Sequence, residues 1–406
     1  MVDTNLGFRT LSEEKISFGG IEVPKKEVVN YLKKLIMKGI LHIFWIYPLN
    51  KNKIFLLNEL SYSYGDSLKY IDQYLHNSEK HNYEVVYSVK EGCEGPGYDI
   101  IVRPNSFGYF KEILSSGTII TNAGGVSYLP KRKGQKVINT WHGGGPYKKT
   151  SIDVYNNYWY RKEVKMNCDN IDYILSSCKY FTEIEAKSMG FEAERCIPTG
   201  LPRNDILFGE HQDIVKKVRD FYSIPDGKKF ILYAPTFRSD SAQSTSKMIS
   251  KHIDLDVDML LSALSTKYKC EWICGIRLHP KLADMGMGGM NVINCTTYPD
   301  MQELLCCADA IITDYSSLMW DYSFTYRPVF LYAPDIEQYE KERGFYMPVS
   351  EWPYPIAHDN EEMKKVIYEF DEAEYVRKVK LHHAASGSFE KGNACEILMQ
   401  LIEKVQ

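Results

Sequence analysis

Short apolar runs alternate with helical patterns along the chain from residue 51 onward. The runs are rich in β-branched and aromatic side chains, which is typical of buried strands. Strands are predicted at 53–57, 83–87, 100–102, 117–121, 136–139, 172–175, 230–233, 272–276, 291–293, 310–312 and 329–332. Helices are predicted between them, for example at 67–78 and 106–114. This alternation predicts an α/β fold with parallel sheets covered by helices on both faces.

The strands fall into two series, which predicts two domains. With 406 residues the chain is long enough for both, because single cores rarely grow beyond about 250 to 300 residues. The charged segment 211–220 separates the series and carries no strand, so we place the boundary within 208–223. The expected units are an N-terminal extension, two domains and a C-terminal helical region, at 1–50, 51–210, 211–381 and 382–406.

The N-terminal extension contains an apolar segment at 28–49 that Lys33, Lys34 and Lys38 interrupt. Its longest run almost free of charge, 39–49, is too short to span a membrane. Two interpretations stay open: a helix lying in a membrane interface, or a helix packed on the first domain. Because the start of the chain is polar, we expect no cleavable signal peptide. A cytoplasmic protein is expected, with peripheral contact to the inner face of the membrane as an option.

Composition narrows the function classes. A formal net charge of −4 argues against a general nucleic-acid binder, which would need a basic surplus. The ten cysteines are irregularly spaced and form no pair of CxxC motifs. Neither a zinc site nor a disulfide framework is therefore expected, and reduced cytosolic thiols fit better.

Polar and glycine-rich clusters follow several predicted strands. In open α/β sheets, ligands bind beyond the carboxyl ends of the strands, so we expect these clusters to converge on one crevice. Each also has a structural alternative: a hydrogen-bonded histidine, a flexible glycine turn, a solvated arginine or a helix cap. The residues concerned are His142, Gly143, Gly144, Arg203, Asn204, Asp205, Thr236, Arg238, Arg277 and His279.

The segment 310–321 reads as a buried strand that runs into the start of a helix. Asp314, Ser316 and Ser317 are residue types that favour a helix start, where unpaired N–H groups and hydroxyls suit a phosphate. Asp321 lies one turn beyond Ser317 on the same face, so its carboxylate could face a ligand there. The alternative is a capped surface helix without a ligand.

Several segments in one order resemble the CDP-glycerol glycerophosphotransferase family of teichoic acid primases, polymerases and related capsule enzymes. They are Trp141-His142-Gly143, 200–205, 232–238, 277–280, 312–321 and 343–346. The resemblance covers roughly 51–398 and implies a GT-B architecture: two Rossmann-like domains face each other across a cleft, the second holds most of the donor, and the region after about 382 crosses back to the first. The family usually has threonine where this chain has Gly144, and the chain adds a residue there, which leaves the acceptor open.

The resemblance also implies transfer of glycerol phosphate or ribitol phosphate from a CDP-polyol to an acceptor hydroxyl, with release of CMP. The acceptor would be lipid-linked or a polymer, in teichoic-acid or capsule-type synthesis. His142 is the candidate general base, with His279 as the alternative. The CDP-polyol is a co-substrate, and no dedicated metal site is expected. The remaining assignments are donor binding for Arg277, Ser316, Ser317, Asp321, Thr236, Arg238 and Asp314, and acceptor or cleft contacts for Gly143, Gly144, Arg203, Asn204 and Asp205.

Two other functions remain possible on these residues. The first is a GT-B glycosyltransferase that uses a nucleotide sugar, since it would share the cleft and the phosphate site. The second is a nucleotide-binding scaffold of an envelope-assembly complex that has no catalytic activity.

Overall fold

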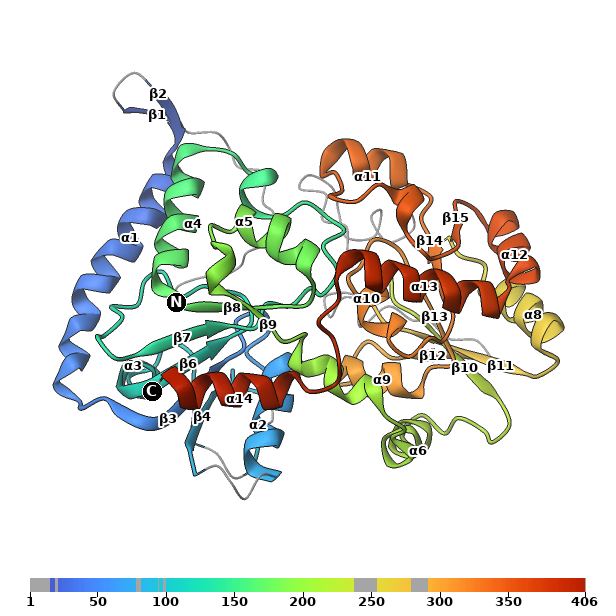
Figure 1. Ribbon diagram of the computed structural model, residues 1–406, viewed down its shortest axis with the longest axis horizontal. Coiled ribbons are helices and arrows are strands. Elements are labelled where there is room, and N and C mark those ends of the chain that lie inside the picture. Colours follow the sequence, from blue (N-terminus) through green and yellow to red (C-terminus); the bar gives the residue numbers. More distant parts are fainter. Residues whose placement is uncertain are drawn as a thin grey trace.

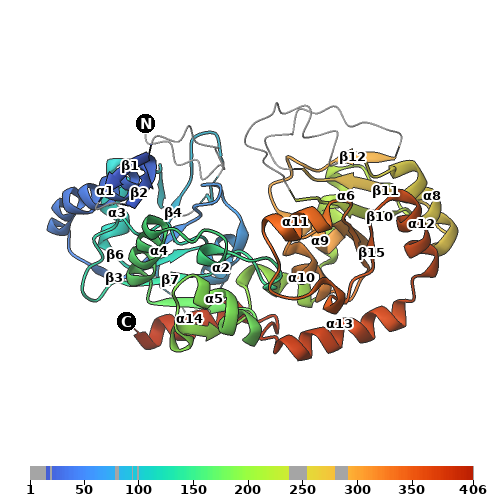
Figure 2. The same cartoon turned by 90° about the horizontal axis from the view of Figure 1, so that it is seen from above.

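The computed structural model describes residues 15–18, 21–77, 82–93, 95–97, 100–236, 254–278 and 291–405. They form an α/β molecule with two large parallel sheets that lie side by side in Figures 1 and 2. The first sheet has the order β5-β4-β3-β6-β7-β8-β9 and the second the order β12-β11-β10-β13-β14-β15. The predicted α/β class with parallel sheets is therefore confirmed.

The predicted strands are all present. The first sheet consists of β3 (Asn50–Leu57), β4 (Glu84–Ser88), β5 (Ile100–Val102), β6 (Ser116–Thr121), β7 (Lys136–Asn139), β8 (Tyr173–Ser176) and β9 (Cys196–Pro198). The second consists of β10 (Lys229–Tyr233), β11 (Trp272–Ile276), β12 (Val292–Asn294), β13 (Ala310–Thr313), β14 (Val329–Tyr332) and β15 (Ile356–Ala357). In the central strand β3, residues 54–57 are fully buried, as expected for a strand covered on both faces.

Helices connect the strands. They are α2 (Asp66–Asn77), α3 (Phe107–Ser115), α4 (Tyr158–Asn170), α5 (Ala186–Ser188), α6 (Gln212–Phe221), α8 (Val257–Tyr268), α9 (Met301–Cys307), α10 (Leu318–Ser323), α11 (Ile336–Glu342), α12 (Asn360–Glu369), α13 (Glu372–Ser386) and α14 (Ala394–Val405). Shorter helical turns are η2 (Ser151–Asp153), η3 (Phe181–Glu185), η4 (Ala193–Arg195), η5 (Pro202–Phe208) and η7 (Val349–Glu351). The boundary placed within 208–223 falls between the last strand of the first sheet and the first strand of the second.

The N-terminal extension begins with a hairpin of β1 (Lys15–Phe18) and β2 (Ile21–Pro24), which the sequence pattern did not predict. The helix α1 (Lys25–Leu41) and the turn η1 (His42–Ile46) follow. One side of α1 packs on α4, where the rings of Tyr31 and Trp159 are 5.4 Å apart and Lys34 pairs with Glu163. No helix in the described part of the chain is long and apolar enough to span a membrane.

The C-terminal region joins both domains. Helix α13 lies along the second domain, and the chain then crosses to the first, where α14 packs (Figure 2). Leu398 and Ile402 of α14 share an apolar cluster with Ile54 and Leu56 of β3. The first domain therefore includes residues from both ends of the chain.

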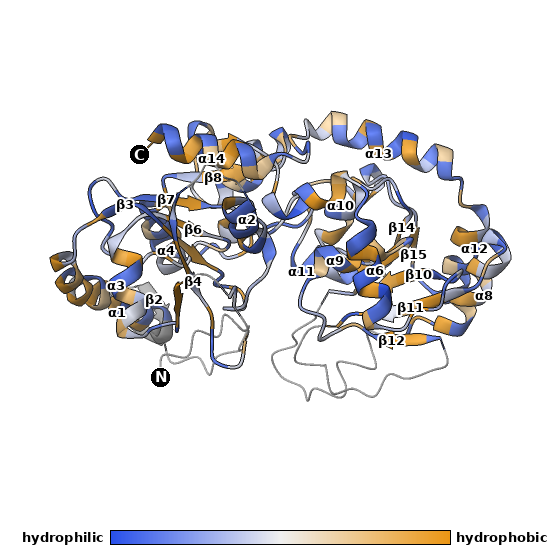
Figure 3. Ribbon diagram, turned by 90° about the horizontal axis from the view of Figure 1, so that it is seen from below, coloured by the Kyte–Doolittle hydropathy of each residue, from blue (hydrophilic) through white to orange (hydrophobic). Residues whose placement is uncertain are grey.

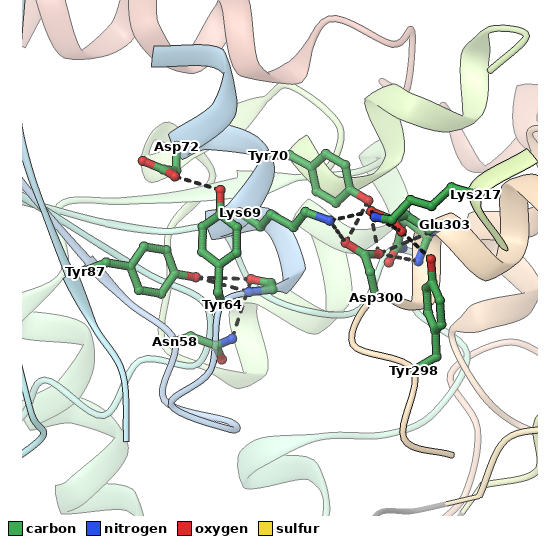
Figure 4. A network of polar contacts seen from close by, with 12 residues as sticks. Asn58, Tyr64, Lys69, Tyr70, Asp72, Tyr87, Lys217, Tyr298, Asp300 and Glu303 are labelled. Atoms are coloured by element: carbon green, nitrogen blue, oxygen red, sulfur yellow. Dashed lines mark hydrogen bonds and ion pairs between the residues drawn. The ribbon is translucent and has the colours of Figure 1, made fainter. Parts of the chain in front are cut away.

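An ionic network also connects the domains, between α2 and the start of α9 (Figure 4). Lys69 donates to Asp300 at 2.5 Å and to Glu303 at 2.8 Å, and all three side chains are buried. Tyr70 also donates to Asp300, and Lys217 pairs with Glu303 at 2.7 Å. These contacts fix α2 of the first domain against the second.

Candidate active site

His142 lies in the loop that follows β7. Its Nδ1 is 2.9 Å from the backbone carbonyl of Asn122. Because a carbonyl oxygen only accepts, Nδ1 carries the proton and Nε2 keeps its lone pair. Burial lowers the pKa of His142 below its usual value, although the Asn122 carbonyl and Asp66 act in the opposite direction. The imidazole is therefore neutral near pH 7, with Nε2 able to accept a proton.

The glycines after His142 seat this loop on α10 of the second domain. A Cβ atom at Gly143 would lie 3.8 Å from Oγ of Ser317, so the loop meets the start of that helix. A Cβ atom at Gly144 would lie 2.1 Å from Cδ1 of Trp320, too close for any side chain. The hydroxyl of Ser177 donates to the Gly144 carbonyl. The packing at Gly144 thus leaves no room for a side chain beside the buried Trp320.

The rest of the loop pairs with residues 343–346 of the second domain. The Lys149 amide donates to the Gly344 carbonyl at 3.1 Å, and the Tyr346 amide donates to the Tyr147 carbonyl at 2.8 Å. Arg343 adds a bond from Nε to the Lys149 carbonyl. The motif at 343–346 therefore holds the histidine loop through backbone contacts.

Arg203 lies at the centre of a buried charge network between the domains. Its Nη1 is 3.0 Å from Oδ1 of Asp66, and its Nη2 is 2.7 Å from Oδ2 of Asp321. Asn204 donates to the other oxygen of Asp321 at 3.1 Å. Burial alone would raise the pKa of the Asp66 carboxyl, but Arg203 and Asn122 lower it below its usual value.

This network changes the interpretation of two predicted residues. Arg203 is buried and paired on both sides, so the alternative of a solvated surface charge is wrong. The Asp321 carboxylate is 1% exposed and binds Arg203 and Asn204 rather than facing the start of its own helix. A buried carboxylate needs a charge partner, and Arg203 of the first domain supplies it.

Asp205 caps a helix that lies far away in the sequence. Its carboxylate accepts from the amides of Ala394 and Cys395 at 2.8 and 2.9 Å, at the start of α14. Asp205 is thus a helix cap, but it caps the C-terminal helix and not the turn that follows it, which was the expected alternative. Glu390, just before α14, accepts from the Leu201 amide at 3.1 Å, and burial raises its pKa to about 8. Nothing in the sequence indicated Glu390, because its position depends on the crossing of the chain.

Two of the residues predicted to bind the CDP-polyol, Thr236 and Asp314, follow strands of the second sheet. Asp314 accepts from the amide and the hydroxyl of Thr236, at 2.9 and 2.5 Å, and so joins the ends of β10 and β13. A pocket lies beside this pair, lined by Tyr233, Pro235, Tyr332, Pro334 and Asp335.

The two serines lie at the junction of β13 and α10. Both are half-buried, and the Ser316 hydroxyl accepts from the Leu318 amide at 3.3 Å. Ser317 occupies the N-cap position, but its side chain makes no cap hydrogen bond. Arg277 donates from Nη1 to the carbonyls of Cys295 and Tyr298, which holds the following loop.

Arg238 and His279 lie outside the described residues, so their predicted roles stay predictions. Among the residues that are described, no group of three or more His, Cys, Asp and Glu side chains could hold a metal ion. Turnover without a dedicated metal likewise stays a prediction.

The structure thus brings part of the predicted set together at the domain interface. Those residues are His142, Gly143, Gly144, Ser317, Arg203, Asn204 and Asp321. A family model for CDP-glycerol:poly(glycerophosphate) glycerophosphotransferase matches residues 40–404. The chain belongs to this family.

Relatives in the family are enzymes of teichoic acid synthesis. A teichoic acid poly(glycerol phosphate) polymerase of Staphylococcus epidermidis is 30% identical over 365 residues, which cover 84% of this chain and 49% of that protein. A teichoic acid glycerol-phosphate transferase of Staphylococcus aureus is 28% identical over 396 residues, which cover 93% of this chain and 100% of the relative. The chain therefore spans about half the length of the polymerase and all of the transferase.

The family also has a solved fold. A structure of the wall teichoic acid polymerase TagF is similar with a TM-score of 0.79 at 27% identity, and the match covers 93% of this chain and 96% of that one.

Proposed function

We propose that this chain transfers a polyol phosphate from CDP-glycerol or CDP-ribitol to an acceptor hydroxyl and releases CMP. The family membership over 40–404 carries this proposal. The acceptor is lipid-linked or a growing polymer, in the synthesis of a teichoic-acid or capsule-type polymer. The arrangement is of the GT-B type, in which the two sheets turn the carboxyl ends of their strands toward one cleft. The contact of Gly143 with Ser317 supports it, because these residues follow β7 and β13 of the two sheets.

The reaction is a displacement at phosphorus. The acceptor oxygen attacks the phosphorus that is bonded to the polyol, the bond from that phosphorus to the CMP oxygen breaks, and a phosphodiester forms. Nε2 of His142 accepts the hydroxyl proton, and its neutral state near pH 7 supports that role. His279 is the alternative base.

Hydrogen-bond donors after the strands of the second sheet bind the diphosphate and stabilise the charge that develops on it during transfer. We assign Ser316, Ser317, Arg277 and His279 to this task. The half-buried serine hydroxyls at the β13–α10 junction support the assignment. The pocket lined by Thr236 and Asp314 lies at the end of β13, the strand that leads into this junction, and we assign it to another part of the CDP-polyol.

The N-terminal helix supports peripheral binding at the inner face of the membrane. Ile36, Ile40, Ile43 and Ile46 recur at helical spacing and are 61 to 75% exposed. Ile36 and Ile40 lie on α1, and Ile43 and Ile46 lie on the turn η1 that follows it. Figure 3 shows hydrophobic positions on α1 at the edge of the first domain. Exposed apolar residues beside Lys33 are typical of a helix that lies on an anionic lipid surface. A membrane position would place the enzyme next to a lipid-linked acceptor.

A donor screen tests the reaction. The purified chain is incubated with CDP-glycerol, CDP-ribitol and UDP-sugars in the presence of acceptor, and released nucleotides and products are identified by mass spectrometry. We expect CMP from one of the CDP-polyols. Release of UDP alone would establish the nucleotide-sugar transferase instead. A chain that releases no nucleotide but keeps its partner function after His142→Ala would be the scaffold.

A further inference from the structure

Asn122 is a buried residue that hydrogen-bonds both to His142 and to groups of the neighbouring loops. It follows β6 and is fully buried. Its backbone carbonyl accepts from Nδ1 of His142, and its side-chain amide donates to Asn58 at 2.9 Å and to Asp66 at 2.6 Å. Its side-chain oxygen accepts from the Glu59 amide at 3.1 Å. All polar groups of the Asn122 side chain are thus bonded, so the carbonyl that orients the imidazole cannot turn away.

The connection continues into the second domain. Asp66 binds Arg203, and Arg203 binds Asp321 on α10, the helix whose start carries Ser317. Two backbones in this region are in the left-handed conformation, with φ of +55° at Asp66 and +57° at Trp141. Such conformations cost free energy at residues other than glycine and persist only where the surroundings impose them. Trp141 directly precedes His142, and Asp66 is one of the charged groups that act on its imidazole.

We propose that Asn122, Asp66 and Arg203 are positioning residues of the transfer reaction, which hold His142 with Nε2 unprotonated and couple it to α10. This inference rests on the proposed role of His142 as the base. Asn122 sets the tautomer and orientation of the ring. Asp66 and Arg203 set the charge around the ring, and the bond from Arg203 to Asp321 links them to α10 of the second domain.

Three charged groups act on the imidazole, from α2, from η5 and from its own loop. Asp66 raises the pKa of His142, whereas Arg203 and Lys148 lower it, against a background of burial that also lowers it. Removing the carboxylate should therefore make the ring harder to protonate, and removing the guanidinium should make it easier. A general loss of structure would not shift the pKa of His142 in opposite directions in the two variants. Opposite shifts therefore distinguish a positioning role from such a loss.

The test is the pH dependence of kcat/KM for CMP release. For a neutral base, activity falls as pH drops through the pKa of the base, so the acidic limb reports His142. We expect Asp66→Asn to move this limb to lower pH and Arg203→Gln to higher pH. Each shift should be roughly half a pH unit, below the roughly 1 to 3 units that a charge in direct contact produces, because Asp66 and Arg203 act on the ring through space. Asp220→Asn and Arg377→Gln, in exposed ion pairs, are matched controls that should leave the limb in place.

Arg203→Lys covers the case in which Arg203→Gln does not fold. It keeps the charge but loses the two-sided contact, so kcat should fall roughly 10- to 100-fold while the acidic limb stays where it is, as expected for a misplaced catalytic group. Asn122→Ala should lower kcat to a similar extent without a comparable change in KM. The proposal would be overturned if the acidic limb stayed in place, or moved in the same direction, for both Asp66→Asn and Arg203→Gln. If Arg203→Lys folds but Arg203→Gln does not, an unchanged limb for Asp66→Asn would overturn it.

His142→Ala separates this inference from the proposed function. If that variant keeps full activity, His142 is not the base and the proposed mechanism fails. If activity is lost but the limbs of the Asp66 and Arg203 variants do not move, only the positioning role fails. NMR titration of isotope-labelled histidine, with the His142 signal assigned from the alanine variant, measures the same shifts without catalysis.

Discussion

Gly144→Ala tests whether the histidine loop sits on α10 as described. The added methyl group would lie 2.1 Å from Cδ1 and 2.6 Å from Nε1 of Trp320, well below the 3.0 Å that real Cβ contacts respect. Trp320 cannot give way, because it is fully buried and packs on the rings of Phe324 and His383 at 5.4 Å. The loop must therefore move by about 1 Å, a displacement that can cost roughly a hundredfold in rate.

Two assays follow this substitution. We expect kcat/KM for CMP release to fall roughly a hundredfold. We also expect the free energy of unfolding, measured with urea, to fall by about 1 to 3 kcal/mol, the usual cost of overpacking a core. Gly108→Ala is the matched control, since its new methyl group would meet no atom closer than 3.8 Å. A Gly144→Ala protein that matches this control in both assays would refute the seating of the loop on Trp320. Gly144→Thr, which restores the usual residue of the family, should be more damaging still.

Further predictions concern the domain interface and the membrane. Lys69→Met leaves Asp300 and Glu303 buried with one cation fewer. The free energy of unfolding should therefore fall by about 3 kcal/mol, as for other broken buried ion pairs. A change below about 1 kcal/mol, the range of surface pairs, would contradict the burial of this network. Ile36→Glu combined with Ile40→Glu should abolish sedimentation with anionic vesicles while activity on a soluble acceptor persists. Unchanged sedimentation would exclude α1 as the membrane contact. Addition of EDTA should leave CMP release within about twofold, since no dedicated metal is expected; a complete loss restored by one divalent cation would contradict that.

The strands could be predicted because most are continuous apolar runs, buried on both faces of a parallel sheet. Besides the N-terminal hairpin, two strands of the large sheets were missed for lack of such a run. Cys196–Pro198 forms the edge strand β9, but Pro198 and Gly200 give the segment the composition of a turn. Ile356–Ala357 has only two residues and no readable period.

The position of a candidate residue could be predicted where it follows soon after a strand, as for His142. It could not be predicted where a partner comes from a distant part of the chain. Asp205 accepts hydrogen bonds at the start of α14, and Asp321 pairs with Arg203. These contacts form because the chain crosses between the domains and because buried carboxylates need bonded partners. Gly144 was assigned to the cleft, yet its backbone approaches Trp320. Sequence position indicated that a close approach occurs there but not which group is approached.

The fate of the phosphate next to the polyol tests the central claim most directly. The enzyme is given CDP-glycerol with a radiolabel in the phosphate bonded to glycerol, together with acceptor. Attack at that phosphorus predicts that the label enters the product and that the released nucleotide is unlabelled CMP. Recovery of the label in CDP, with unlabelled glycerol in the product, would show that the bond between the polyol carbon and oxygen breaks instead, and would contradict phosphotransfer by this chain.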